Sequence, residues 1–233
     1  MNSRYPIQPL GFERVSTYPL ETRKSKVHAG MFGKPMDGSE NILAFVSKLP
    51  HILAGNGLRA LIRAILYAYS SGKPMIWGLG GPVIKVGLGP VIVDLMQSGF
   101  VTGIAMNGSA AIHDFEVALR GATSEEVEEQ IGEGRFGMAR ETGEYMNRAI
   151  AQAAADGIGM GEGLGRFINH PPDTGTAFQY RASSILAEAE SRNIPVTVHV
   201  AIGTDIIHTH PEASGQAVGR SRPQSGSIPR LKR

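Results

Sequence analysis

Apolar side chains recur at intervals of three and four residues across positions 41–70. They are Ile42, Phe45, Val46, Leu49, Leu58, Leu61, Ile62, Ile65 and Leu66. This period is that of an amphipathic helix, and the run Ala54-Gly55-Asn56-Gly57 interrupts it. The pattern therefore predicts two helices, separated at 54–57.

Short apolar runs follow, and each ends at glycine or a polar turn. The run 74–77 ends at Gly78, and the run 100–106 ends at Asn107-Gly108. A helical segment over 90–97 lies between them and stops at Ser98-Gly99, where glycine can adopt the left-handed cap. Strand, helix and strand in this order predict parallel pairing with a right-handed crossover.

A third strand is predicted over 195–201, after helices at 110–119, 138–155 and 177–191. Thr123-Ser124 followed by Glu125-Glu126 is typical of a helix start, and the Gly- and Pro-rich stretch 156–176 predicts a loop. The fold class is therefore α/β: a parallel sheet with helices on both faces, of Rossmann-like type. Since no segment after the third strand is suited to cover it, we expect the sheet to be incomplete.

The same patterns divide the chain into three parts. Residues 1–40 mix Pro, Gly, Ser and charge without a period and predict an extended arm; residues 41–211 form the α/β domain. Residues 212–233 predict a disordered basic tail, because its last fourteen residues carry five positive charges and no acid: Arg220, Arg222, Arg230, Lys232 and Arg233. We favour a solvated tail over one that binds nucleic acid.

Composition narrows the class of protein. With 233 residues, 42% of them hydrophobic, the chain can bury a core. It has no run of roughly 20 apolar residues and no signal-peptide pattern at its start, so we expect a cytoplasmic protein without a membrane partner. The absence of cysteine excludes disulfides, thiolate metal sites and cysteine nucleophiles.

The ends of the three predicted strands are where chemistry is expected, because ligands of open α/β sheets bind beyond the carboxyl ends of the strands. After the first, Gly78, Gly80 and Gly81 would let a phosphate or ribose approach the backbone. Gly78 and Gly80 match the first two glycines of the dinucleotide fingerprint, but Val83 stands at the third. Taken alone, tight-turn packing explains these glycines equally well.

The second strand end leads through Asn107 and Gly108 into a helix that carries His113, Asp114 and Glu116. His113 and Glu116 share a helix face, and a carboxylate beside an imidazole can fix its tautomer and raise its basicity. These three residues are the candidate acid–base group. A capping histidine with solvated acids is the alternative, and it would be preferred if the neighbouring strand ends carried no polar groups.

The third strand end carries Asp205, suited to accept hydrogen bonds from ribose hydroxyls or a substrate amine. His208 and His210 follow, and His199 lies on the strand itself. His208 and His210 could ligate a metal, but two ligands without a clear third one do not define a metal site. We therefore predict no metal and assign these histidines a structural or hydrogen-bonding role.

Taken together, the segments 72–81, 111–119 and 193–205 resemble the deoxyhypusine-synthase-like superfamily, and the first two are also similar to archaeal-type NAD-dependent ornithine cyclodeaminases. The resemblance implies an NAD-binding fold, often tetrameric with sites between subunits, in which NAD oxidises an amine carbon to an imine. It implies that the NAD site is lined by Gly80, Gly81, Asn107, Gly108, Asp114 and Asp205.

The chain departs from that family after Asp205, where its only lysine is Lys232. The lysine that takes the aminobutyl group in deoxyhypusine synthase has no counterpart, so we expect a chain that lacks the C-terminal part and does not form hypusine. The sequence favours an NAD-dependent enzyme, or a truncated remnant of one, that acts on an amine or amino acid as a homo-oligomer. The alternative is a non-catalytic module for nucleotide binding or oligomerisation.

Overall fold

The computed structural model describes residues 11–172 and 177–221. It divides the chain into two compact units, Met1–Arg63 and Ala64–Arg233, whose boundary falls inside one long helix. The boundary therefore differs from the division at 40/41 expected from composition. Each unit is described below by itself.

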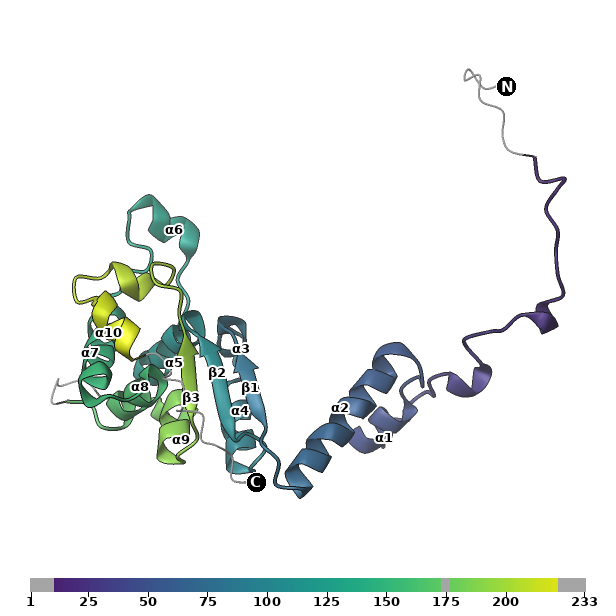
Figure 1. Cartoon of the computed structure of the whole chain (residues 1–233), viewed down its shortest axis with the longest axis horizontal. Coiled ribbons are helices and arrows are strands. Elements are labelled where there is room, and N and C mark those ends of the chain that lie inside the picture. Colours follow the sequence, from purple (N-terminus) through teal and green to yellow (C-terminus); the bar gives the residue numbers. More distant parts are fainter. Residues whose placement is uncertain (1–10, 173–176, 222–233) are drawn as a thin grey trace, which may run out of the picture. The chain divides into compact units, whose positions relative to one another are not determined.

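The first unit holds the 3-10 turns η1 (Leu20–Thr22) and η2 (Ala29–Met31), the helix α1 (Ile42–Lys48) and the start of α2 (Leu53–Ser70) (Figure 1). Two helices were predicted here, but the predicted break at 54–57 is wrong. The break lies at 49–52, because a residue that precedes proline avoids the helical region and Leu49 precedes Pro50. Gly55 and Gly57 lie inside α2.

Arg59 holds the turn between α1 and α2 together. Its guanidinium donates to the carbonyl oxygens of Pro50 and Gly55, each at 3.0 Å, and to that of Leu49. The N–H of His51 donates to the Met31 carbonyl at 2.8 Å, so the segment before α1 lies against this turn. No described residue of the first unit is buried.

The second unit contains a parallel sheet of β1 (Ile76–Leu79), β2 (Gly103–Asn107) and β3 (Val196–His199), in that spatial order. Trp77 pairs with Ile104, which in turn pairs with Val196. The predicted parallel α/β architecture is confirmed. All three strands end at the same edge of the sheet, which is the arrangement that the strand-end prediction required.

Helices accompany this sheet, and several of them differ from expectation. The helices are α3 (Gly81–Lys85), α4 (Gly89–Gln97), α5 (Gly108–Arg120), α6 (Val127–Gly132), α7 (Arg140–Asp156), α8 (Met160–Asn169), α9 (Ile185–Ser191) and α10 (Gly215–Arg220), with 3-10 turns η3 (Arg181–Ser183) and η4 (Ile206–Thr209). The loop predicted over 156–176 holds α8, the helix predicted from residue 177 begins only at Ile185, and α10 lies in the predicted tail.

The glycines of α8 explain why a helix stands where a loop was expected. A side chain at Gly161 would collide with the carbonyl of Val196, one at Gly163 with Ala153, and one at Gly165 with the Leu186 carbonyl. Glycine here permits close packing against β3, α7 and α9, which outweighs its poor helix propensity. Similarly, α10 buries Ala217 and Val218 and packs on α7. The domain thus continues to residue 221, and residues 222–233 of the predicted tail lie outside the described residues.

The two faces of the sheet differ in how far their side chains are buried. Ile104, Met106 and Val198 point into the core, where α5 and α8 pack on the strands. Ile76 is on the opposite face and is 58% exposed, and His199 is exposed there too. Within the described residues 64–221, the face of Ile104, Met106 and Val198 is thus the more deeply buried one.

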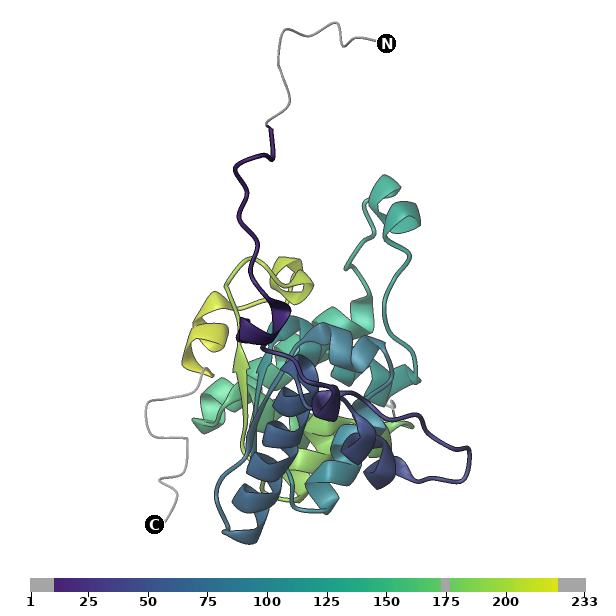
Figure 2. The same cartoon turned by 90° about the vertical axis from the view of Figure 1, so that its right-hand side faces the viewer.

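The segment between α5 and α7 projects from this body near the strand ends and carries α6 at its tip (Figures 1 and 2). Glu125 accepts from the N–H of Gly137 at 3.1 Å, and His210 Nε2 bonds the carbonyl of Gly137 at 2.9 Å. These bonds anchor the base of the projection. No helix in the described parts of the chain combines the length and apolarity that crossing a membrane requires.

Candidate functional site

A hollow of about 340 Å³ lies at the edge of the sheet where the strands end. We call it the edge hollow. Its polar lining comes from α3, α5, the α6 projection and the loop after β3, and consists of Lys85, Ser109, His113, Glu116, Ser124, Glu125, Thr204 and Asp205. Apolar contacts come from Ile112, Val127, Phe136 and Ile206. Ligand sites of about 300 to 1,000 Å³ are typical, so this volume suits a small molecule or one end of a larger one.

Helix α5 places two of the predicted acid–base residues in the edge hollow. Asn107 caps α5 by accepting from the Ala110 N–H at 2.9 Å, which fixes the start of the helix. His113 and Glu116 then fall on one face, with His113 Nδ1 3.8 Å from Glu116 Oε2. Both side chains are 16% exposed. The structure brings these two residues together in the hollow.

Two threonines complete this pair, and sequence reasoning missed both. The hydroxyl of Thr123 lies 2.7 Å from His113 Nδ1 and donates to Glu116 Oε2, while the hydroxyl of Thr142 donates to Glu116 Oε1 at 3.0 Å. A hydroxyl has a single proton, so Thr123 must accept from His113, which makes Nδ1 the protonated nitrogen. His113 Nε2 is then the basic nitrogen.

The carboxylate of Glu116 is stabilised by its partners. Burial raises the pKa of Glu116, but the nearby His113 and the hydrogen bonds from Thr123 and Thr142 outweigh it, and the pKa lies below the usual value. Glu116 is therefore ionised at neutral pH. An ionised carboxylate in this position supports a basic imidazole at His113.

The Asp114 side chain lies outside the edge hollow. It is 1% exposed and caps α9: Ser184 Oγ donates to it at 2.6 Å, and the N–H groups of Ile185 and Leu186 donate at 2.8 and 3.0 Å. Burial raises the pKa of Asp114, while these three hydrogen bonds oppose the rise. The side chain does not line the edge hollow and holds the start of α9, so its expected catalytic and NAD-lining roles stay predictions.

Asp205 follows β3 and reaches the start of α5. A side chain at Gly108 would overlap the Asp205 carboxylate, so the glycine makes room for it. Among the described residues, Asp205 Oδ2 is buried without a hydrogen-bond partner. Burial raises the pKa of Asp205 and the nearby His208 lowers it, with a net rise. An orphaned carboxylate oxygen beside a helix N-terminus is a site prepared for a hydrogen-bond donor.

The remaining predicted cofactor residues are spread along the same edge. Gly78 lies within β1, not after it, and Gly80 precedes α3. A side chain at Gly81 would collide with Ser109 and crowd His113, so this glycine lets α3 pack on α5. Asn107 serves as the α5 cap. The structure thus gives Gly81 and Asn107 packing and capping roles beside the hollow, and their contact with a cofactor stays a prediction.

The histidines after β3 have partners within the fold. His208 Nδ1 accepts from the Gly203 N–H at 3.1 Å, and His210 bonds Gly137 as described above. His199 Nε2 lies 2.9 Å from the hydroxyl of Thr197. In the described residues, no group of three His, Asp or Glu side chains is arranged to hold a metal ion.

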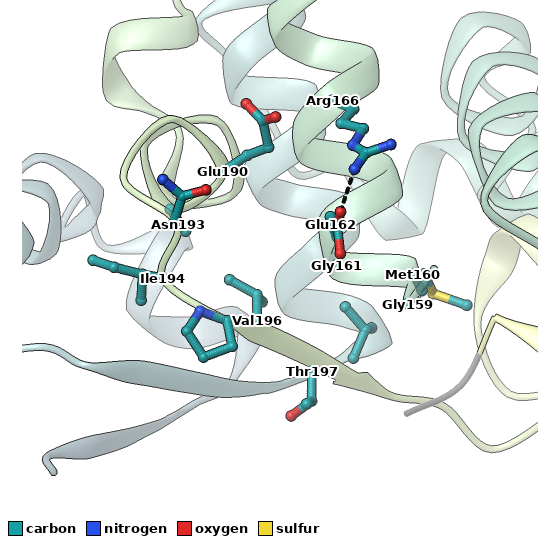
Figure 3. Close-up of a pocket in the computed structure, with 13 residues that line it drawn as sticks. Gly159, Met160, Gly161, Glu162, Arg166, Glu190, Asn193, Ile194, Val196 and Thr197 are labelled. Atoms are coloured by element: carbon teal, nitrogen blue, oxygen red, sulfur yellow. Dashed lines mark hydrogen bonds and ion pairs between the residues drawn. The ribbon is translucent and has the colours of Figure 1, made fainter. Parts of the chain in front are cut away.

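A second hollow, of about 280 Å³, flanks β3 (Figure 3). Figure 3 shows Glu162 and Arg166 of α8 joined in an ion pair, with Glu190 and Asn193 at another side of the same space. Glu190 in turn accepts from Asn169 at 2.9 Å. The labelled charged groups therefore bond within the fold, and none of the predicted site residues lines this hollow.

No protein-family model and no curated protein matches the sequence. Several solved structures are similar in shape at low identity. An arginine dihydrolase of the ornithine–ammonia cycle in cyanobacteria, ArgZ, is 15% identical over 72% of this chain and 22% of its own, with a TM-score of 0.42. A protein from Entamoeba histolytica assigned as a deoxyhypusine synthase is 14% identical over 71% and 63%, with a TM-score of 0.44.

A LOR/SDH-type protein from Methanococcus maripaludis S2 is 17% identical, covers 89% of this chain and 51% of its own, and has a TM-score of 0.40. The chain thus spans less than two thirds of the length of each of these three proteins. A protein assigned as a deoxyhypusine synthase is among them, as the sequence resemblance led us to expect. At such TM-scores the likeness is loose, and no conclusion about the function of this chain rests on it.

Proposed function

We propose that the edge hollow is the active site of an NAD-dependent enzyme that acts on an amine or amino acid. The observation that carries the proposal is that His113, held as the Nδ1–H tautomer, and Asp205, with an orphaned oxygen, line the same hollow at the carboxyl edge of a parallel sheet. Acid–base chemistry and nucleotide recognition both belong at this place in the fold.

The charges around the hollow favour a cationic substrate. The lining holds three carboxylates and one lysine: Glu116, Glu125, Asp205 and Lys85. With a neutral His113, its net charge is therefore negative. Such a lining attracts an ammonium group. His113 Nε2 takes a proton from the bound substrate, and the carboxylate of Glu116 stabilises the imidazolium that results.

The residues present fit NAD at one point. The carboxylate of Asp205 lines the hollow and fills the space that Gly108 leaves at the start of α5, and a carboxylate there can accept from a ribose hydroxyl. Bound NAD would supply the hydride acceptor for the carbon that carries the amine. The hollow, of about 340 Å³, has room for one end of a dinucleotide and a small substrate. The rest of the cofactor would lie outside it.

Titration calorimetry of the full chain with NAD at millimolar concentration tests the proposal, followed by an assay of NADH formation with polyamines and basic amino acids. Asp205→Asn is the informative variant. It removes a carboxylate whose folded pKa is raised by burial, so it should not lower the stability of the fold at pH 7, while it loses NAD binding. No heat of binding with the wild type, or equal binding by both proteins, would overturn the assignment.

A second function, assembly with another copy of the chain, is favoured by a different observation. The first unit exposes large apolar side chains, among them Leu53 at 88% and Leu43 at 76%. Exposed apolar groups in such number mark interaction surfaces. Mass measurement after size exclusion, with and without NAD, tests this function: a monomer at all concentrations would exclude it.

A further inference from the structure

We propose that Thr123 and Glu116 form a proton relay, with the Glu116 carboxylate held in place by Thr142, that leads from His113 in the edge hollow to a separate hollow that Glu116 also lines. The inference deepens the proposed function and rests on it for the direction of proton flow. The relay residues are bonded in sequence: His113 to Thr123, Thr123 to Glu116, and Thr142 to the other oxygen of Glu116.

The relay ends at a separate hollow with a volume of about 420 Å³. We call it the exit hollow. It is lined by Glu116 and Thr142, together with Leu119, Arg120, Ala122, Ala139, Glu141 and Tyr145. Glu116 lines both hollows, whereas His113 lines only the edge hollow. The carboxylate therefore stands between the site of chemistry and a space large enough to hold water.

The chain of donors has a single direction. His113 Nδ1 donates to Thr123, whose own proton points to Glu116 Oε2. Thr142 donates to Oε1 and so keeps the carboxylate in place at 3.0 Å. Thr142 is 4% exposed and lies in the first turn of α7, which fixes its hydroxyl. The neighbouring Ser124 adopts φ +72, a conformation that non-glycine residues rarely take and that is often found at functional sites.

The proton balance is complete without a further reagent. His113 Nε2 receives one proton from the substrate, and the Nδ1 proton passes to the oxygen of Thr123. The original hydroxyl proton of Thr123 passes to Glu116 Oε2, and Glu116 releases one proton to water in the exit hollow. His113 is left neutral with its tautomer exchanged. It is reset when Nε2 gives its proton to the departing product or to water in the edge hollow, while one proton from the exit hollow returns through Glu116 and Thr123 to Nδ1. No bond other than O–H and N–H changes, and nothing is oxidised or reduced.

In this account Thr123 and Glu116 are positioning residues that act through His113. Thr123→Val removes the hydroxyl at nearly constant shape, and Thr123→Ser keeps it, so the two form a matched pair. With the proposed activity, Thr123→Val should lower kcat about 100-fold with KM nearly unchanged, and Thr123→Ser should restore it. A structural role alone would be expected to lower the amount of folded protein and leave kcat per folded molecule unchanged.

A measurement without substrate decides the relay separately from the enzyme function. Full-length protein labelled with ¹⁵N-histidine is examined by long-range ¹H–¹⁵N NMR at a pH where His113 is neutral. We expect the Nδ1–H tautomer in the wild type and Thr123→Ser, and its loss in Thr123→Val. Exchange of the Nδ1 proton with solvent should be about tenfold slower in Glu116→Gln.

The outcomes separate the two proposals. An Nε2–H tautomer in the wild type, an unchanged tautomer in Thr123→Val, or equal proton exchange in Glu116→Gln would each overturn the relay. Failure to turn over any amine with NAD would overturn the proposed function and leave the NMR result standing. If the tautomer and exchange behave as expected, the relay is supported whichever substrate the protein uses.

Discussion

Residues 11–63 and residues 64–221 contain helices of similar amphipathic pattern, yet only the second region has a core. In α2, Leu61 is 57% exposed, whereas Phe115 and Leu164 in the second region are completely buried. The apolar stripe of α2 is as clear in the sequence as that of α5. The comparison teaches that an apolar stripe predicts a helix and its inward face, but does not say what covers that face.

The largest difference in the free energy of unfolding is expected when leucines in the two regions are truncated to alanine. Leu164→Ala in α8 should lower the free energy of unfolding by about 3 to 5 kcal/mol, because the cavity would lie between packed helices. Leu61→Ala should change it by less than about 0.5 kcal/mol, because the side chain is mostly exposed. Urea unfolding of both variants checks the contrast. A loss of several kcal/mol at Leu61 would show that this face is covered in solution.

The Asp114 cap should give the next effect. Asp114→Ala leaves Ser184 Oγ and the N–H groups of Ile185 and Leu186 without their acceptor in a buried site. We expect a loss of about 3 kcal/mol. Asp114→Asn keeps one acceptor oxygen and should lose about half as much. If Asp114→Ala were as stable as the wild type but inactive, Asp114 would belong to the chemistry and not to the fold.

A pair of glycines sharpens the comparison further. Gly161→Ala would push a methyl group into the Val196 carbonyl and should cost about 1 to 3 kcal/mol. Gly57→Ala in α2 meets open space and should stabilise the protein by about 0.5 to 1 kcal/mol through higher helix propensity. Thermal unfolding of the two variants should therefore shift in opposite directions. Shifts of the same sign would contradict the described packing.

The smallest effect depends on pH. The folded pKa of Glu116 is lowered, so its carboxylate contributes stability above the ordinary glutamate pKa of about 4.3, and this contribution is lost as the pH falls through the lowered value. The difference in stability between wild type and Glu116→Gln should be largest near pH 7 and shrink towards pH 3. A difference that grows on acidification would have the wrong sign for this network.

The parallel sheet and much of the site were predictable from sequence. Strand ends of a parallel sheet meet at one edge, so Asp205 and the start of α5 had to come near each other, and the spacing of His113 and Glu116 placed them on one helix face. The burial of Asp114 was not predicted. It falls within the stripe of Ala111, Phe115 and Ala118, and this periodicity was a signal of its burial.

Other features had no local signal. Thr142 meets Glu116 from another helix, 26 residues away in the chain. Thr123 was expected to start a helix, but α6 begins at Val127 and the hydroxyl bonds His113 and Glu116 instead. The helix α8 was missed because its three glycines are chosen by contacts with β3, α7 and α9, which only the tertiary structure reveals.

The most direct test of the account is a titration of the full-length, ¹⁵N-histidine-labelled protein with NAD, observed at the individual histidines. His113 lines the edge hollow, whereas His170 lines a different one between α7 and α8 and serves as the internal control. The account predicts that NAD shifts the His113 resonances with saturation and leaves those of His170 in place. An unmoved His113, or equal shifts at both histidines, would contradict the edge hollow as the site.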